Sequence, residues 1–118
     1  MKSHKDLDVW KAAVTLAKDI YSLTTSFPRE EQFGMSAQMR RCAISIASNI
    51  AEGAARQGNK EFTQFLHIAL GSGAELETQL VIAKEVGLGS AIEIDKLDLD
   101  LIRIRQMLRG LIQSIKAP

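Results

Sequence analysis

Few residues of this sequence have the types and spacing that catalysis or metal binding requires. The chain has one cysteine, Cys42, and two histidines, His4 and His67, which lie far apart in the sequence. A zinc site needs about four sulfur, nitrogen or oxygen donors, and a nucleophilic thiol or hydroxyl needs a base beside it. A dinuclear iron site in a helical bundle needs Glu-x-x-His pairs, and the sequence contains none. We therefore expect no enzymatic activity, no bound metal and no cofactor.

A polar stripe in the segment "RRCAISIASNIAEG" (residues 40–53) is the next feature that could carry function. Its members are Arg41, Ser45, Ser48 and Glu52, and their steps of four and three place them on one side of a helix. Asn49 lies beside them. Such a stripe is usually a face in contact with solvent. The alternative is a hydrogen-bonded network that fixes the register of neighbouring helices.

The expected partner of this stripe lies in the segment "GSGAELE" (residues 71–77). If the chain reverses direction at Gly58, antiparallel helices bring Arg41 level with residues 72–75. We therefore expect Arg41 to contact Glu75 or a neighbour of Glu75. The complete register network would then consist of Arg41, Ser45, Ser48, Asn49, Glu52 and Glu75.

The charge pattern gives a weaker indication of function. A net charge of +1 argues against a surface built mainly to bind nucleic acid. In the last helical segment acidic residues precede basic ones, and the helix dipole favours that order by itself. The alternative is a basic rim that contacts nucleic acid, and its candidate residues are Arg56, Lys60, Arg103, Arg105 and Arg109.

Length and composition indicate one domain over residues 1–118 in the cytoplasm. A chain of 118 residues can bury one hydrophobic core without disulfides. The start, "MKSHKDLDVW", lacks the apolar centre of a signal peptide. No run approaches the roughly 20 apolar residues that a membrane span needs. A single cysteine fits a reducing compartment.

Apolar residues that recur at steps of three and four predict four helices, separated by turns at Pro28 to Gly34, at Gly58 and at Gly87 to Gly89. The first helix, residues 7–25, has the expected core stripe Trp10, Ala13, Ala17, Ile20 and Thr24. The second has the stripe Met35, Met39, Cys42, Ile46, Asn49 and Gly53, with alanines beside it that allow a close helix contact.

The third and fourth helices have the most regular stripes. They consist of Phe62, Leu66, Ala69, Gly73, Leu76, Leu80 and Ala83, and of Ile94, Leu97, Leu101, Ile104, Leu108, Leu111 and Ile115. We expect Ser36, Asn59 and Ser90 to cap the last three helices, with Ser90 and Glu93 in a capping box. Short connections between such helices predict an all-α fold, an antiparallel up-down-up-down four-helix bundle.

Apolar residues outside the core stripes predict self-association. Scattered exposed leucines are normal on any protein surface, but rows of them at heptad spacing more often mark a partner surface. The first helix has such a row, whose members are seven residues apart, and the second and fourth helices add single residues. The candidate subunit interface therefore consists of Val9, Leu16, Leu23, Ile44, Leu99 and Ile102.

Three segments, "LDVWKAA", "REEQFGMSAQMRRCAISIASNIAEG" and "EFTQFLHIALGSGAELETQL", resemble a known family. It is the four-helix-bundle family named after proteins encoded in intervening sequences of bacterial large-subunit ribosomal RNA. The resemblance implies a cytoplasmic bacterial protein, a left-handed bundle and a homopentamer. A relative, the accessory protein of diversity-generating retroelements, is a basic pentamer that engages nucleic acid and a reverse transcriptase.

Two functions are consistent with these observations. The first is a non-enzymatic homo-oligomeric bundle with a structural or adaptor role. The alternative is an RNA-binding accessory factor associated with ribosomal RNA or a reverse transcriptase, which would make structured RNA or an RNA-binding enzyme a partner. Because phosphate binding depends on salt, binding to RNA at low ionic strength distinguishes the two.

Overall fold

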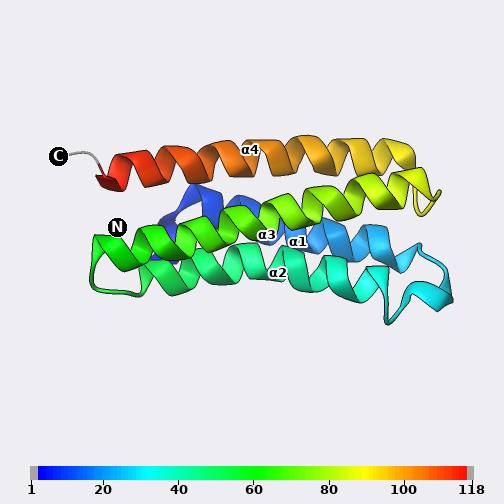
Figure 1. Ribbon diagram of the computed structural model, residues 1–118, viewed down its shortest axis with the longest axis horizontal. Helices are drawn as coiled ribbons and strands as arrows, with labels where there is room; N and C mark the ends of the chain where they lie inside the picture. Colours follow the sequence, from blue (N-terminus) through cyan, green and yellow to red (C-terminus); the bar gives the residue numbers. More distant parts are fainter. Residues whose placement is uncertain (1–2, 117–118) are drawn as a thin grey trace.

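Four long helices run antiparallel along the protein in the computed structural model, which describes residues 3–116 (Figure 1). They are α1 (Asp8–Thr25), α2 (Met35–Ala54), α3 (Asn59–Glu85) and α4 (Ala91–Lys116). The short 3-10 helices η1 (His4–Asp6) and η2 (Arg29–Glu31) precede α1 and α2. No strand occurs within residues 3–116. The prediction of an all-α four-helix bundle is confirmed.

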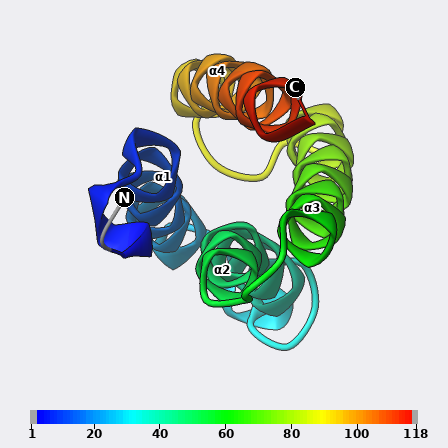
Figure 2. The same ribbon diagram turned by 90° about the vertical axis from the view of Figure 1, so that its left-hand side faces the viewer.

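The four helices occupy the corners of a square when the bundle is viewed along its length (Figure 2). Each helix packs against the helices next to it in the chain, and α1 also packs against α4, which closes the bundle. As a result α2 and α4 lie at opposite corners (Figure 2). The α2–α3 loop lies at the same end of the bundle as the carboxyl end of α4 (Figure 1).

The core stripes of α3 and α4 follow the sequence pattern closely. On α3 the expected residues from Leu66 to Ala83 are buried, and only Phe62 is half-buried. On α4 the match holds as far as Leu108, after which Ile112 is buried while Leu111 and Ile115 are half-buried. An α-helix has 3.6 residues per turn, so a stripe with a strict seven-residue repeat drifts around the helix. By the last turns of α4 the drift moves the predicted positions off the core.

The structure corrects the prediction for α1. Val9, Leu16 and Leu23, expected at a subunit interface, are 4%, 1% and 0% exposed and belong to the bundle core. Apolar side chains occupy adjacent positions along α1, such as Leu16 and Ala17, so its apolar face is one broad stripe. The large branched side chains take the centre of that stripe, where they bury more apolar area. Trp10 and Ala17, expected in the core, are half-buried at its edge.

Helix α2 packs closely against α3. A Cβ atom on Gly53 would lie 2.8 Å from Cβ of Phe65, so this position has no room for a larger residue. The amino ends of both helices differ from the prediction, because glycines, Gly34 and Gly58, take the N-cap positions with no side-chain hydrogen bond. Ser36, the expected cap, instead lies within the first turn of α2 and is buried.

The turn after α3 ends the helix by backbone hydrogen bonds. The amide of Leu88 donates to the carbonyl of Ala83 at 2.8 Å, and the amide of Gly87 donates to the carbonyl of Lys84 at 3.2 Å. This pair of bonds is a Schellman motif, which requires a left-handed residue at its centre. Gly87 fulfils this requirement with φ of 78°.

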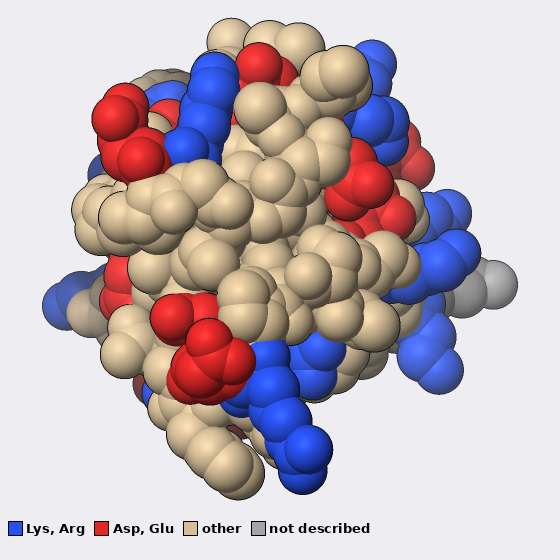
Figure 3. Space-filling view, turned by 90° about the vertical axis from the view of Figure 1, so that its right-hand side faces the viewer, with Lys and Arg blue, Asp and Glu red and all other residues tan. Residues whose placement is uncertain are grey.

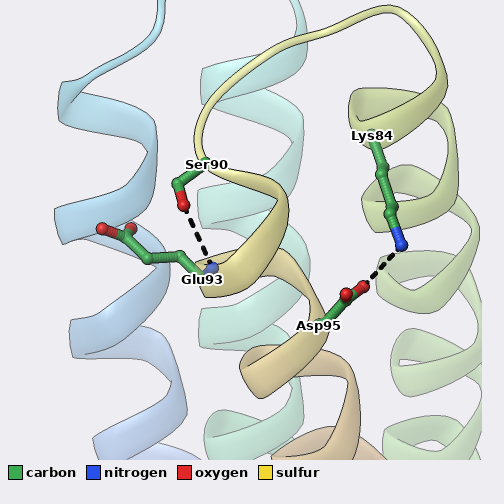
Figure 4. A network of polar contacts seen from close by, with 4 residues as sticks. All are labelled: Lys84, Ser90, Glu93 and Asp95. Carbon is green, nitrogen blue, oxygen red and sulfur yellow. Dashed lines mark hydrogen bonds and ion pairs between the residues drawn. The ribbon is translucent and has the colours of Figure 1, made fainter.

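The start of α4 is held by two polar contacts (Figure 4). The hydroxyl of Ser90 accepts a hydrogen bond from the amide of Glu93 at 3.3 Å, which is one half of the expected capping box. The carboxylate of Glu93 points away from Ser90 (Figure 4), so the other half is not formed. Lys84 of α3 forms an ion pair with Asp95 of α4 at 2.8 Å. These contacts favour one direction for the first turn of α4 relative to α3.

Candidate functional site

A polar cluster joins α2 to α3 at mid-length. The hydroxyls of Ser45 and Ser72 share a hydrogen bond of 2.9 Å. The side-chain amide of Asn49 donates to the carbonyl and to the hydroxyl of Ser45, at 2.8 and 3.0 Å. All three residues are half-buried. Since a hydrogen bond is strengthened by removal from water, the cluster favours one register between the two helices.

Arg41 and Glu75 lie on either side of a cavity of about 300 Å³ between α2 and α3. Both side chains are exposed. Within residues 3–116 Arg41 has no hydrogen-bond or ion-pair partner, and the carboxylate of Glu75 accepts a long hydrogen bond of 3.5 Å from Gln79. The expected contact between Arg41 and Glu75 is therefore not made. In an exposed pair the entropy of ordering two long side chains offsets most of the attraction.

Cys42 lies in the wall of the same cavity, where its surroundings disfavour the thiolate. Its thiol donates a hydrogen bond to the carbonyl of Ser72 at 3.3 Å. Burial, and then the nearby carboxylate of Glu75, raise the pKa of the Cys42 thiol from 9.0 to about 12. Only the thiolate attacks electrophiles or binds metals. At neutral pH this cysteine is a small apolar residue with a weak donor.

The remaining residues of the expected register network face solvent. Ser48 is exposed and joins no partner within the described part of the chain. Glu52 forms an exposed ion pair with Arg56, one helical turn away, at 3.2 Å. Arg56 also lies over the ring of Phe65, with its guanidinium carbon 5.0 Å from the ring centre. The six predicted residues thus do not form a single network.

The candidate nucleic-acid contacts lie on different sides of the bundle. Arg103 is exposed and lines a cavity between α1 and α4. Arg105 lies between α3 and α4, where it forms an ion pair with Glu77 at 3.3 Å. Its side chain is 20% exposed, and its Cγ lies 3.2 Å from where a Cβ of Gly73 would stand. Arg105 therefore holds two helices together and is poorly placed to contact nucleic acid.

Asp98, a half-buried acidic residue of α4, was missed by the sequence reasoning. Asp98 lies one heptad before Arg105, beside the core stripe rather than opposite it. Burial, and then the carboxylates of Glu77 and Asp95, raise the pKa of Asp98. The sequence signal was present, since charged residues seven apart and next to core positions predict a polar contact with the neighbouring helix.

The comparisons with known proteins assign the chain to a family. Residues 5–110 match the family described as 23S rRNA-intervening sequence protein. The chain belongs to this family. This intervening-sequence protein is similar to the crystal structure of a protein with unknown function from the S23 ribosomal protein family of Bacteroides thetaiotaomicron. The TM-score is 0.80 at 25% identity, over 89% of this chain and 98% of that chain. Among curated proteins, none matches.

Several apolar side chains of the intervening-sequence protein are exposed. Of the candidate interface residues, Ile44 on α2 is 43% exposed, and Leu99 and Ile102 on α4 are 68% and 38% exposed. Sequence reasoning missed further exposed apolar residues on α3 and α4, namely Val81, Ile82 and Ile92. Ile92 lies seven residues before Leu99 and could have been found by the same spacing.

No metal centre is visible in this arrangement. Within residues 3–116, no group of three or more His, Cys, Asp or Glu side chains is placed to hold a metal ion. His67 is exposed on α3, and His4 packs edge-on against Trp10 with ring centres 4.9 Å apart. In the same described range, no helix combines the length and apolar character of a membrane span.

Proposed function

We propose that this intervening-sequence protein is a cytoplasmic, non-enzymatic homo-oligomer that serves as a structural or adaptor protein. The observation that supports it is a row of exposed apolar side chains on the outer face of α4: Ile92, Leu99 and Ile102. Steps of seven and three keep the three on one side of the helix. Large apolar side chains repeated along one side of a helix more often mark a partner surface than isolated exposed ones do. The number of subunits, five, comes from the family resemblance.

The position of a second apolar face suggests how copies meet. A closed ring joins two different patches of each subunit, one to the next. On α2 the exposed Ile44 has half-buried alanines, Ala37 and Ala51, seven residues before and after it. Small side chains on either side of one large residue let another helix approach closely. Because α2 and α4 are at opposite corners (Figure 2), we place α4 of one copy against α2 of the next.

Charge substitutions in each patch test this arrangement. Leu99→Glu and Ile44→Glu should each give a monomer by size-exclusion chromatography with light scattering, because a buried unpaired charge opposes association. Mixing the two variants should give a dimer, since each then supplies the patch that the other lacks. Phe33→Glu is the matched control, because Phe33 is 87% exposed in the α1–α2 connection. Wild-type mass for both interface variants would refute the arrangement.

A second candidate function is RNA binding, as an accessory factor of ribosomal RNA or of a reverse transcriptase. Exposed Arg56 and Lys60 flank the α2–α3 loop, at the end of the bundle where α4 finishes with Lys116 (Figure 1). Arg109 lies about two turns before that end of α4. Repetition of this small basic group around a ring would strengthen weak binding by multivalency.

A gel-shift experiment with structured RNA at low ionic strength tests the second candidate. Binding should weaken steeply with added salt and should be lost in the double variant Arg56→Gln with Lys60→Gln. Lys18→Gln, an exposed lysine on α1, is the control for loss of charge. Absence of any salt-sensitive shift would exclude RNA binding and leave the adaptor role.

A further inference from the structure

A polar cavity of about 360 Å³ lies at the corner where α1 turns into α2. It is at the end of the bundle seen in Figure 3, where uncharged surface fills the middle and charged side chains lie around the rim. Phe27 and Pro28 form the apolar part of the cavity wall. The rest carries hydroxyl, amide and guanidinium groups: Thr24, Thr25, Arg29, Gln32, Ser36 and Arg40. No carboxylate lines it, although Glu30 and Glu31 belong to the same turn of chain. The cavity therefore combines two positive charges with no negative one.

Arg40 is held in a fixed position at this cavity. Its Nε donates to the hydroxyl of Thr24 at 2.8 Å, and that hydroxyl donates in turn to the carbonyl of Ile20, also at 2.8 Å. The guanidinium lies over the ring of Tyr21, with 4.5 Å between its central carbon and the ring centre. Its Nη2 makes a long hydrogen bond of 3.5 Å to the hydroxyl of Thr25, and its Nη1 has no partner within residues 3–116. A donor that is already ordered loses little entropy when it binds a ligand.

Two further donors at the cavity have no partner. Ser36 is 5% exposed, and its hydroxyl makes no hydrogen bond with any described residue. The hydroxyl oxygen itself is not sealed from the cavity, so it is free to donate to a ligand there. Arg29 from η2 likewise has no acceptor in the described range. Three segments thus bring donors to one cavity. They are η2 with Arg29, the first turn of α2 with Ser36, and the second turn of α2 with Arg40.

We propose that this cavity binds a phosphate group, carried either by a small phosphorylated molecule or by the backbone of RNA. The guanidinium of Arg40 offers its Nη1 to one phosphate oxygen, Arg29 supplies a second charge, and Ser36 donates to another oxygen. The proposal is independent of the subunit interface and of the basic residues near the α2–α3 loop.

NMR titration of the full chain with inorganic phosphate, at constant ionic strength set by chloride, tests the proposal. The side-chain Nε–H signal of Arg40 and the amide signal of Ser36 should shift and saturate. Arg40→Gln and Ser36→Ala should each weaken binding by about tenfold or more, because each removes a hydrogen bond to a charged group. Arg41→Gln is the matched control: the next residue carries the same charge but lines the other cavity, so affinity should stay within about twofold.

Two variants keep the test independent of folding. Ser36→Ala removes a hydroxyl that makes no hydrogen bond with any described residue, so it should not lower stability. Arg29→Gln removes a guanidinium that makes no hydrogen bond or ion pair with any described residue, and it should also weaken phosphate binding. The proposal is overturned if the signals do not saturate, or if Arg41→Gln weakens binding as much as Arg40→Gln does.

Two further ligands distinguish a small phosphorylated molecule from the RNA backbone as the source of the phosphate group. A nucleoside monophosphate carries a terminal phosphate, whereas a short RNA with a 5′-hydroxyl end offers only phosphodiesters. Stronger binding of the monophosphate assigns the cavity to small phosphorylated molecules, and stronger binding of the RNA assigns it to the nucleic-acid backbone. Either result supports the site if Ser36→Ala weakens it, and failure of both ligands to shift the Ser36 amide overturns it.

Discussion

Arg41 of α2 and Glu75 of α3 line one cavity yet form no ion pair, although their positions along the two helices match. The hydrogen bond that joins α2 to α3 at this level is between shorter, uncharged side chains, Ser45 and Ser72, and Asn49 supports Ser45 from the same helix. A small hydroxyl group can be half-buried with its hydrogen bonds satisfied, whereas a guanidinium loses far more hydration. The helix pair is therefore linked by hydroxyl groups, and the two charges stay in water.

Replacement of Arg41 by methionine should change the free energy of unfolding by less than about 0.5 kcal/mol, as at other exposed sites without a partner. Urea unfolding followed by circular dichroism measures this change. The corresponding test of the hydroxyl contact is Ser45→Ala, which should cost about 1 kcal/mol by leaving Asn49 and Ser72 short of a partner. A clear loss of stability in Arg41→Met, with recovery in the double variant with Glu75→Leu, would show that the charges are coupled.

Two glycines in helices give opposite predictions for the same substitution. Gly53→Ala should destabilise the protein by about 1–3 kcal/mol, since the added methyl would overlap Phe65 and force α2 away from α3. Gly71→Ala should stabilise it by up to about 1 kcal/mol, because nothing lies within 4 Å of the new Cβ and alanine favours a helix. Thermal unfolding of both variants checks this, and equal effects would contradict the close packing at Gly53.

The Cys42 thiol should make stability fall at high pH. Its pKa is about 12 in the folded protein, against a reference of 9.0, so the folded state holds the proton more tightly than the unfolded state does. The contribution is complete below pH 9 and is lost as the pH rises from 9 towards 12, by up to about 1 kcal/mol per pH unit. Urea unfolding at pH 8 and pH 10 should show a smaller loss for Cys42→Ala than for wild type. Equal losses would show that the thiol is not perturbed.

Sequence patterns predicted α3 and α4 well and α1 less well, for a physical reason. Along the middle of α3, polar residues and glycines separate the core positions from Gly73 to Leu80, so one face is favoured, although Leu80 is followed directly by Val81 and Ile82. On α1 apolar residues occupy neighbouring positions, such as Leu16 and Ala17, and a rotation of about 100° separates them. Only the packing of the other three helices decides which of two neighbouring residues, such as Leu16 or Ala17, points into the core.

The same limit applies to the candidate sites. Arg40 and Arg41 are adjacent and chemically identical in the sequence, but Arg40 points to α1 and contacts Tyr21 and Thr24, while Arg41 lines the cavity beside α3. Counting residues from Gly58 placed Arg41 level with Glu75 correctly. It could not show which side chains would meet, because that depends on the rotation of each helix and on the cost of removing charge from water.

Sedimentation equilibrium of the wild-type protein at micromolar concentration tests the central claim most directly. The exposed apolar rows on α4 and α2 predict a single closed assembly, and the family resemblance predicts five times the monomer mass of 13.0 kDa. The mass should not depend on protein concentration over a tenfold range of about 1–10 μM, because a closed ring has no free patch for further growth. A species of monomer mass would contradict the account.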